Sequence, residues 1–311
     1  LTVEKILSAG DTLPPDWPAS GTTGYESIEA PAVVLVDGQR IDALRDAYQQ
    51  QLGQPLYMEQ ELRAARALMV DRNFAGEFAT LLGLATEIAT AEGEAPHEAA
   101  IRDALRELLL AFPVYRTYGT ANGLPPADQA LLARVVEQVS HGARAPDPQA
   151  LGFIVRLLRG EAATGAELAD SFRTRFQQLS GPLMAKSVED TLFFRHSINL
   201  ALNEVGAEPL PRRLDPQQFH QAMAERLAQQ PDGITSTSTH DTKRGEDARA
   251  LLYTLSEAPQ RWAALVARWQ QHNRGAVQQL ADGPAPRPAG EWMLYQALAG
   301  VWPPTLQADD T

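Results

Sequence analysis

Residues 234–241 have the sequence Ile-Thr-Ser-Thr-Ser-Thr-His-Asp, which predicts a short strand that stops at a histidine and an acidic residue. The start of the chain has a similar pattern, because strand-like residues around Val3 are followed by Glu4. In α/β barrels the catalytic groups lie at the carboxyl ends of the strands. These two short strands therefore predict an α/β barrel in which Glu4 and Asp241 point into the same mouth.

Most of the sequence between these strands predicts helices. Residues 39–112 are rich in Ala, Leu, Glu and Arg and place apolar side chains at helical spacing, and helices return over residues 126–178 with a break near 142–148. Between them, residues 113–118 (Pro-Val-Tyr-Arg-Thr-Tyr) are β-prone and are closed by Gly119. One long helical excursion between barrel strands accounts for this part of the chain.

The rest of the sequence predicts a return to the barrel and a helical end. Residues 181–206 start as a loop and continue as a helix, with a capping box at 187–190 (Ser-Val-Glu-Asp). A helix is expected from Thr242 to about Leu255, and a Pro- and Gly-rich loop at 283–290. We therefore expect four segments: a barrel segment with Glu4 (1–38), a mainly helical insertion (39–178), a barrel segment with the His-Asp motif (179–256) and a C-terminal helical segment (257–311).

The composition restricts the kind of protein. The 311 residues carry a formal net charge of −12, and this acidic surface repels phosphate backbones, so nucleic acid is not an expected partner. The absence of Cys excludes disulfides and thiol nucleophiles and fits a reducing cytoplasm. No apolar run is long enough to cross a bilayer, so we expect a soluble protein without a membrane partner. The start at Leu1, without an initiator Met, predicts a piece of a larger protein.

Glu4, His240 and Asp241 have the chemistry needed to break a glycosidic bond. That reaction needs a carboxylic acid to protonate the leaving oxygen and a negative charge to support an oxocarbenium-like transition state. His240 could donate a hydrogen bond to a sugar hydroxyl. Simpler interpretations also fit: Glu4 as a solvated charge, His240 as a structural histidine, and Asp241 as the cap of a helix that starts at Thr242. These residues alone do not define an enzyme.

Other chemistries find less support in the sequence. The six histidines are scattered without metal-ligand spacing, so no metal or cofactor is expected. Gly21-Thr-Thr-Gly24 lacks the Gly-Lys-Ser/Thr ending of a phosphate loop, and no Gly-x-Ser-x-Gly elbow marks a serine hydrolase. Trp262 and Trp269 have a helical spacing that more often indicates core packing than a sugar platform.

Several longer strings in a fixed order carry a resemblance to a known family. They are Val3-Glu-Lys-Ile-Leu7, Gly21-Thr-Thr-Gly-Tyr25, Met184-Ala-Lys-Ser-Val-Glu-Asp-Thr191, Asn203-Glu-Val-Gly206, Ser238-Thr-His-Asp-Thr-Lys-Arg244, Tyr295-Gln296 and Gly300-Val-Trp-Pro303. Together they resemble the maltooligosyltrehalose synthases, a branch of the α-amylase superfamily (glycoside hydrolase family 13). The match covers nearly the whole chain, and its specificity lies in the ordered combination.

The resemblance implies a fold and an activity. The fold would be a TIM barrel from about its fifth strand onward, with a large, mostly helical insertion. The activity would be an intramolecular glucosyl transfer that converts the reducing-end α-1,4 linkage of a maltooligosaccharide to an α,α-1,1 linkage. In this family Glu4 corresponds to the general acid/base. Asp241 corresponds to the third carboxylate, which orients the sugar and stabilises the transition state.

The resemblance also implies substrate-binding residues, namely His240, Lys186, Asp190, Tyr25, Lys243 and Arg244. His240 would contact the hydroxyls of the distorted glucose. Lys186 and Asp190 would help to build the pocket for the reducing-end glucose, which Tyr25 would line. The family further implies a functional link to a maltooligosyltrehalose trehalohydrolase, and its chemistry needs no metal.

The sequence departs from the family pattern in two places. The nucleophilic Asp of the family lies in an Arg-x-Asp-His-x-Asp-Gly-Leu type of motif that residues 1–311 do not contain, so the chain by itself is expected to be inactive. Ser187 stands where the family usually has Gly, which makes the backbone there less free.

Two other interpretations stay open at this point. A related amylase-type hydrolase or 4-α-glucanotransferase would share the Glu and His-Asp elements but lack the Ala-Lys-x-x-Glu-Asp-Thr and Asn-Glu-Val-Gly strings. A non-catalytic helical scaffold would place Glu4 and Asp241 far apart on unrelated surfaces. Glycosidase carboxyl pairs, by contrast, lie within roughly 5–10 Å of each other.

Overall fold

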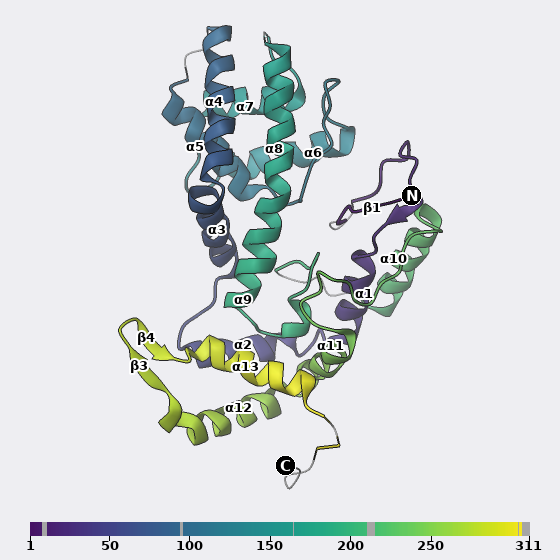
Figure 1. Ribbon diagram of the computed structural model, residues 1–311, viewed down its shortest axis with the longest axis vertical. Helices are drawn as coiled ribbons and strands as arrows, with labels where there is room; N and C mark the ends of the chain where they lie inside the picture. The colour runs from purple at the N-terminus through teal and green to yellow at the C-terminus, as the bar shows by residue number, and fades with distance from the viewer. Residues whose placement is uncertain (8–10, 94–95, 164, 210–214, 304, 307–311) are drawn as a thin grey trace. The chain divides into compact units, whose positions relative to one another are not determined.

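A computed structural model describes residues 1–7, 11–93, 96–163, 165–209, 215–303 and 305–306 of the chain. Over these residues the fold is mostly helical, with a few short strands. The chain forms two compact units, which are described separately below (Figure 1). Unit 1 contains residues 1–58 and 192–311, and unit 2 contains residues 59–191. None of the helices in the described ranges is both long and apolar enough to span a bilayer.

Unit 2 is built from helices around one apolar core. Its helices are α3 (Met58–Leu68), α4 (Ala75–Glu92), α5 (Glu98–Ala111), α6 (Pro126–Ser140), α7 (Pro148–Arg159) and α8 (Ala166–Ser187), with π-helical turns at Met69–Asn73 and Val188–Leu192. The long helices α4 and α8 lie side by side (Figure 1). Their apolar faces and those of α5 and α7 bury Leu105, Phe153 and Phe172 completely in a single cluster. The predicted helical character of this region is confirmed.

Local chemistry explains where several of these helices begin and end. The Asp147 side chain accepts a hydrogen bond from the backbone N–H of Ala150 (2.9 Å) and caps α7, with Pro148 in the first turn. Helices α4 and α7 end at Gly93 and Gly160, whose positive φ angles of 66° and 78° suit glycine. The predicted break before α7 is confirmed.

Two predictions within unit 2 are wrong. The β-prone segment 113–118 contains no strand, although all its residues are described. Side chains of neighbouring helices bind the backbone around its end instead: Tyr118 N–H donates to Asp128 Oδ2, and Gly119 N–H donates to Gln177 Oε1, both at 2.6 Å. Backbone donors that find side-chain acceptors need no partner strand.

The second error concerns the predicted loop at Gly181 and the capping box at 187–190. Helix α8 continues through Pro182 because apolar side chains on both sides of it are buried in the core of unit 2. Ser187 is the last residue of α8, and its hydroxyl donates to the Met184 carbonyl (3.2 Å) rather than capping a new helix. No described residue other than glycine has a positive φ, so the Ser at this position is not strained.

Unit 1 combines short strands with helices from both ends of the chain. Its elements are β1 (Thr2–Val3), β2 (Gly21–Thr22), α1 (Glu26–Leu35), α2 (Ile41–Leu52), α9 (Phe193–Arg195), α10 (Pro216–Gln229), α11 (Glu246–Tyr253), α12 (Pro259–Asn273), β3 (Gln278–Leu280), β4 (Gly283–Ala285) and α13 (Pro288–Val301), with 3₁₀ turns at Leu200–Leu202, Thr254–Ser256 and Arg274–Ala276. Strands β1 and β2 pair in parallel, and β3 and β4 form an antiparallel hairpin. The hairpin occupies part of the predicted loop at 283–290. The helix predicted within 181–206 is confirmed as far as Arg195, after which only the 3₁₀ turn Leu200–Leu202 precedes Gly206.

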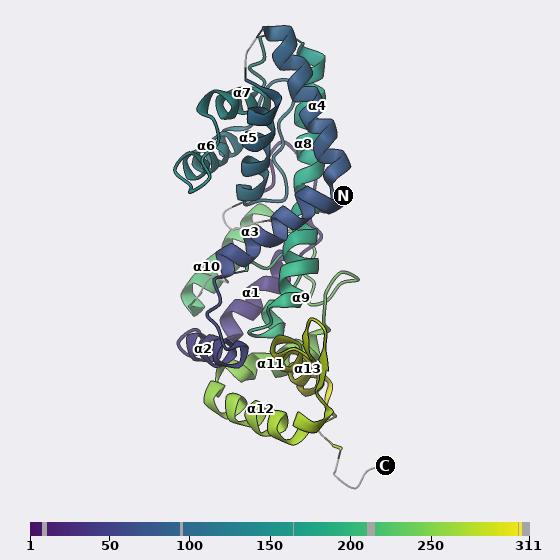
Figure 2. The same cartoon turned by 90° about the vertical axis from the view of Figure 1, so that its left-hand side faces the viewer.

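Helix α2 packs against α12 and α13, so residues 39–58 lie with the C-terminal helices of unit 1 (Figure 2). Tyr48 and Trp292 are fully buried at this contact. Trp262 packs edge-on against both Trp269 and Trp292, with ring centroids 5.7 and 6.0 Å apart. The core role predicted for the two tryptophans of α12 is therefore confirmed.

The strand predicted at 234–239 is wrong, since these residues form extended chain and turns. Ile234 N–H donates to the Thr22 carbonyl (3.4 Å) beside β2, but the pairing goes no further. The hydroxyls of the run bond locally instead; Thr239 Oγ1, for example, accepts from Asp241 N–H (3.2 Å). Ser and Thr hydroxyls compete with strand pairing in this way, and a β-branched run alone does not reveal it.

Candidate active site

The parallel pair β1–β2 brings two of the predicted site residues to one edge. Thr22 pairs with Val3, and the N–H of Thr23 donates to the Val3 carbonyl (3.1 Å). Glu4 directly follows β1, and Tyr25 follows β2 after a short turn. Because the two strands are parallel, Glu4 and Tyr25 leave the sheet at the same carboxyl edge.

Two glycines allow a third segment, which begins at Gly233 and Ile234, to approach the strand pair. Gly24 has a φ of 89°, and a Cβ atom there would lie 2.2 Å from the Ile234 carbonyl oxygen. A Cβ on Gly21 would lie 2.6 Å from the Cα of Gly233. Any other residue at these two positions would push the third segment away from β2. The glycines thus keep the chain that leads to Asp241 against the strand pair.

Tyr25 binds one of the two predicted carboxylates. Its side chain is buried, and its hydroxyl donates to Asp241 Oδ2 at 2.7 Å. Burial, the hydrogen bond to Asp241 and the negative charges of Asp241 and Glu4 raise the pKa of Tyr25 to about 12, although Thr239 acts against them. The structure therefore brings Tyr25 and Asp241 into contact, and Glu4 follows β1 at the same edge of the strand pair.

His240 and Asp241 lie on the open side of this group. The side chains are 85% and 45% exposed, and His240 Nε2 is 3.6 Å from Asp241 Oδ2. Helix α11 begins only at Glu246, with Gly245 at its cap position, so Asp241 is not the helix cap that the simpler interpretation suggested. An exposed carboxylate with one oxygen bound to a tyrosine can still accept hydrogen bonds from a ligand.

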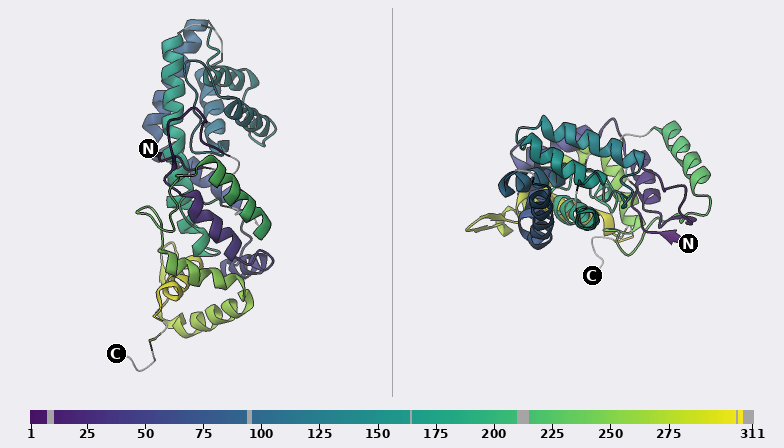
Figure 3. Two further views of the ribbon diagram at one scale, coloured as in Figure 1. Left: turned by 90° about the vertical axis from the view of Figure 1, so that its right-hand side faces the viewer. Right: turned by 90° about the horizontal axis from the view of Figure 1, so that it is seen from above.

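Helix α10 braces the outer side of the strand pair. It lies beside α1 (Figure 3), and Arg226 donates to both Glu26 Oε1 (3.1 Å) and the Ile234 carbonyl (2.6 Å). Gln230 Oε1 accepts the Thr22 N–H at 2.9 Å. These bonds satisfy backbone groups that a further strand would otherwise bind.

Glu204, to which the sequence interpretation gave no role, holds the loop that follows Asp241. It accepts the backbone N–H groups of Lys243 (3.0 Å) and Arg244 (2.9 Å). Burial raises the pKa of Glu204, although the hydrogen bonds and the charge of Arg249 act against this. Burial also lowers the pKa of Arg244. The signal that could have revealed Glu204 is an acidic residue within the apolar stretch 200–205.

Lys186 and Asp190, two further predicted site residues, belong to unit 2. They form an i,i+4 ion pair with Nζ 2.6 Å from Oδ2, and the two side chains are partly exposed. Neighbouring Glu189 is buried and accepts a hydrogen bond from the Tyr115 hydroxyl. Lys186 and Asp190 are thus paired with each other at the end of α8, and their substrate contacts stay a prediction.

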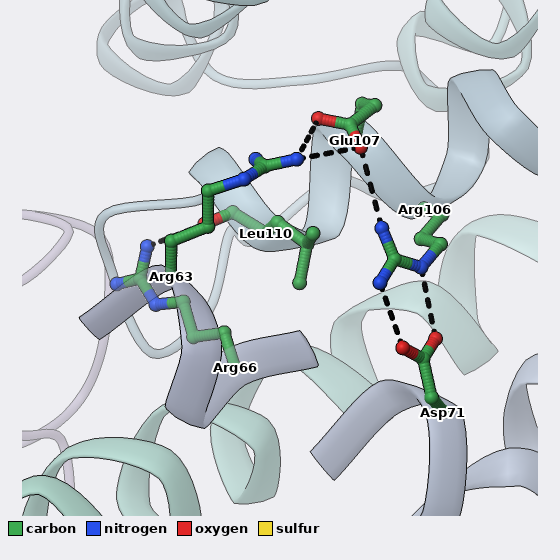
Figure 4. A network of polar contacts seen from close by, with 6 residues as sticks. All are labelled: Arg63, Arg66, Asp71, Arg106, Glu107 and Leu110. Atoms are coloured by element: carbon green, nitrogen blue, oxygen red, sulfur yellow. Dashed lines mark hydrogen bonds and ion pairs between the residues drawn. The ribbon is translucent and has the colours of Figure 1, made fainter. Parts of the chain in front are cut away.

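Unit 2 also contains a charge cluster between α3 and α5 (Figure 4). Arg106 binds Asp71 through two nitrogens at 2.7 and 2.8 Å, and Arg63 donates to both oxygens of Glu107. Arg66 is buried and donates to a carbonyl in the last turn of α5, and burial lowers its pKa to about 10. These groups neutralise one another and bind a helix end, which is a structural role.

Comparison with known proteins shows a relation to trehalose-forming synthases. Two proteins from strains of Mycobacterium tuberculosis, provisionally named maltooligosyl trehalose synthase, are 33% identical over 307 residues, which cover 97% of this chain. The structure of maltooligosyltrehalose synthase from Arthrobacter ramosus matches 97% of this chain and 35% of its own, with a TM-score of 0.77 and 30% identity. A glycosyltrehalose synthase structure matches with a TM-score of 0.73 and 25% identity, over 100% of this chain and 35% of its own. No family model matches the chain.

The chain is therefore a relative of the maltooligosyl trehalose synthases over nearly its whole length. It spans 36% of the length of the curated relatives that it matches. The family resemblance carried by the ordered strings of the sequence is confirmed.

Proposed function

We propose that the full-length protein carrying this sequence is a maltooligosyl trehalose synthase. It would convert the reducing-end α-1,4 linkage of a maltooligosaccharide to an α,α-1,1 linkage by intramolecular glucosyl transfer. The observation that carries this proposal is the position of Tyr25, which binds Asp241 and is influenced by the charge of Glu4. A scaffold would not need a buried tyrosine that binds a carboxylate from a distant part of the chain, at the same strand edge as a second acidic residue.

In this proposal Glu4 is the general acid/base and Asp241 is a carboxylate that binds the sugar. Tyr25 donates to Oδ2 of Asp241 and so orients the carboxylate, which leaves Oδ1 for sugar hydroxyls. The exposed imidazole of His240 is positioned to contact the same sugar. Lys243 and Arg244 follow on the same loop.

The reaction would proceed by two displacements with retention at the anomeric carbon. In the first, the Glu4 carboxylic acid protonates the oxygen between the last two glucose units. The C1–O bond breaks, and a carboxylate nucleophile forms a glycosyl ester. The nucleophile would be an Asp in a motif that residues 1–311 do not contain. The released glucose stays in the pocket.

In the second displacement, the Glu4 carboxylate takes the proton from the anomeric hydroxyl of the retained glucose. The resulting oxygen attacks the glycosyl ester, releases the nucleophile and forms the α,α-1,1 linkage. Water reaching the ester would give hydrolysis instead, so the site must exclude it. Lys186 and Asp190 are proposed to help hold the retained glucose.

We further propose that β1 and β2 are neighbouring strands of a TIM barrel within glycoside hydrolase family 13. Their parallel pairing, and the contact of Ile234 with β2, support three adjacent barrel segments. The helical unit 2 would be the insertion between barrel segments, and we propose residues 59–191 for it in place of the expected 39–178, in agreement with the limits of the compact unit. A cytoplasmic location and a functional link to a trehalohydrolase stay predictions from the composition and the family.

The proposal is tested with the full-length protein and maltohexaose, by following reducing ends and free glucose together. We expect reducing ends to disappear without release of glucose, and Glu4→Gln to abolish this reaction. The matched control is Glu225→Gln, which removes an exposed carboxylate of α10 in the same unit. Release of glucose or shorter reducing sugars would indicate a hydrolase or glucanotransferase. Unchanged substrate would favour the scaffold.

The 311-residue chain alone is expected to be inactive in the same assay because it lacks the motif of the nucleophile. Turnover by the purified chain would contradict this part of the proposal.

A further inference from the structure

Two buried charged residues bind the two ends of the loop 237–244, which carries His240 and Asp241. At the far end, Glu204 is 3% exposed and accepts the N–H groups of Lys243 and Arg244. It reaches them from the segment that follows the 3₁₀ turn Leu200–Leu202. The carboxylate uses one oxygen for each N–H, so it sets both the position and the orientation of the backbone there.

At the near end, Arg249 of α11 binds a backbone carbonyl of the loop. It is 4% exposed, and its guanidinium donates to the Thr237 carbonyl. Arg249 also interacts by charge with Glu204. A buried carboxylate that accepts from N–H groups and a buried guanidinium that donates to a carbonyl thus bind the two ends of the loop.

The side chains of the loop hold it only in part, since Tyr25 binds the Asp241 carboxylate and Thr237 and Ser238 donate to Glu246. His240 and the Asp241 carboxylate are exposed, and a local turn from Thr239 to Thr242 is closed by their own hydrogen bonds. These contacts fix single side chains, whereas Glu204 and Arg249 bind the backbone at the two ends of the loop. Buried charged groups stabilise a protein little compared with apolar residues of similar size, so their presence here favours a positional role.

We propose that Glu204 and Arg249 are positioning residues that fix the backbone of loop 237–244 so that Asp241 meets the substrate in its reacting geometry. The inference rests on the proposed function, because it deepens the role of Asp241 in that reaction. Burial raises the pKa of Glu204, in agreement with a carboxyl held away from water.

The test compares Glu204→Gln, Glu204→Asp and the control Glu225→Gln in the full-length protein. Gln presents one acceptor and one NH₂ group, so one of the two loop N–H groups loses its partner. We expect kcat on maltohexaose to fall about 100-fold with a much smaller change in KM, because a small misplacement of a reacting group has an effect of this order. Glu204→Asp keeps both acceptor oxygens and is expected to recover most of the loss. The control stays at the wild-type rate.

A double-mutant cycle with Asp241→Asn separates positioning from general stability. If Glu204 acts through Asp241, then Glu204→Gln lowers kcat by less than about threefold in the Asp241→Asn background. A stability effect would be additive, and additivity would overturn the proposal. If Glu204→Gln does not fold, Glu204→Asp and Arg249→Lys enter the same cycle with the same expectation.

Hydrogen exchange provides a readout that needs no activity. We expect peptides covering 237–244 to exchange about tenfold faster in Glu204→Gln than in Glu225→Gln, while unit 2 is unchanged. Equal exchange would overturn the proposal. A wild-type protein that makes no trehalosyl product would instead contradict the proposed function, and the exchange comparison would still decide whether Glu204 holds the loop.

Discussion

Unit 2 and unit 1 are held together in different ways. In the described part of unit 2, the buried apolar side chains form one continuous cluster from α4, α5, α6, α7 and α8. In the described part of unit 1 they form three smaller clusters, with buried polar residues between them. Asn199 and Gln296, for example, bind backbone groups of Leu252 (2.9 Å) and Ser197 (2.7 Å).

The difference follows from the backbone of each unit. Helices satisfy their own backbone groups, so unit 2 can fill its interior with apolar side chains. Unit 1 contains short strands, 3₁₀ turns and loops, and their buried backbone groups need side-chain partners. Polar interiors of this kind give position rather than stability. Substitutions in the apolar core of unit 2 should therefore affect mainly stability, and substitutions of the polar residues at the candidate site of unit 1 mainly activity.

After the abolition expected for Glu4→Gln, the largest effect is expected from Asp241→Asn in unit 1. The full-length protein should lose about 10³-fold in kcat on maltohexaose, a size typical of losing a catalytic carboxylate. Its unfolding midpoint in urea should stay near that of the wild type, because the side chain is 45% exposed. A loss of stability without a loss of activity would contradict the catalytic role of Asp241. It would also contradict the expected difference between the two units.

The largest effect on stability is expected from Leu105→Ala in unit 2. Leu105 is fully buried in the apolar cluster, so the substitution should lower the free energy of unfolding by about 2–5 kcal/mol, measured in urea. Below the unfolding transition the kcat should stay within about twofold of wild type. Leu35→Ala, at a 55% exposed position, is the control and should cost less than about 0.5 kcal/mol. A strong loss of kcat in folded Leu105→Ala would break the division between the units.

Tyr25→Phe is expected to have an intermediate effect on both properties. Removing the hydrogen bond to Asp241 should lower kcat about tenfold and reduce stability by about 0.5–1.5 kcal/mol. The pKa of Tyr25 in the folded protein is about 12, above its ordinary value of 10.0, so the folded state keeps a proton that the unfolded state releases. The stability linked to this proton is complete below pH 10 and is lost as the pH rises toward 12.

Urea unfolding at pH 8, 10 and 11 measures this linkage. The stability of the wild type should decline over this range more steeply than that of Tyr25→Phe. Parallel declines would mean that the Tyr25 hydroxyl does not bind Asp241 in solution.

The smallest effect is expected from Asp71→Asn on the surface of unit 2. Hydrogen bonds from Arg106 lower the pKa of Asp71, so its stabilising contribution is present above the ordinary pKa of 3.8 and is lost as the pH falls through the lowered value. Because the carboxylate is 47% exposed, the loss at pH 7 should be about 0.2–1 kcal/mol. Thermal unfolding at pH 7 and pH 2.5 checks this, with exposed Glu87→Gln as the control. An equal difference at both pH values would contradict the assignment.

Much of the fold follows directly from sequence patterns. The helices of unit 2 match stretches with apolar residues at helical spacing, and Asp147 and Gly160 mark helix ends by well-understood chemistry. The strands predicted at 113–118 and 234–239 do not form, because β-propensity describes half-buried pleated surfaces. Here the backbone is bound by hydroxyls in the second run and by helix side chains in the first. Helix α8 passed through Pro182 because its apolar face is buried on both sides of the proline.

Some residues of the candidate site were predicted from the sequence, and others were revealed only by the structure. Glu4, Tyr25 and Asp241 were predicted from strings of residue types in order, and the structure joins Tyr25 to Asp241 at the strand edge that Glu4 follows. Glu204 stands in one of those strings but received no role, because its partners are backbone N–H groups about 40 residues away. Nearly every residue type has the same backbone N–H group, so residue types in the sequence do not reveal such partners.

The sequence by itself determined the family and the helical character of the middle of the chain, and it gave the acidic residues that are candidates for glycosyl transfer. Local periodicity and residue type are properties of neighbouring positions, so one sequence contains them. Only the tertiary structure decided that α2 packs with α12 and α13, that residues 234–241 are a loop, and that Glu204 and Arg249 hold this loop at both ends. These features depend on which distant groups meet in the buried interior, where every polar group must find a partner.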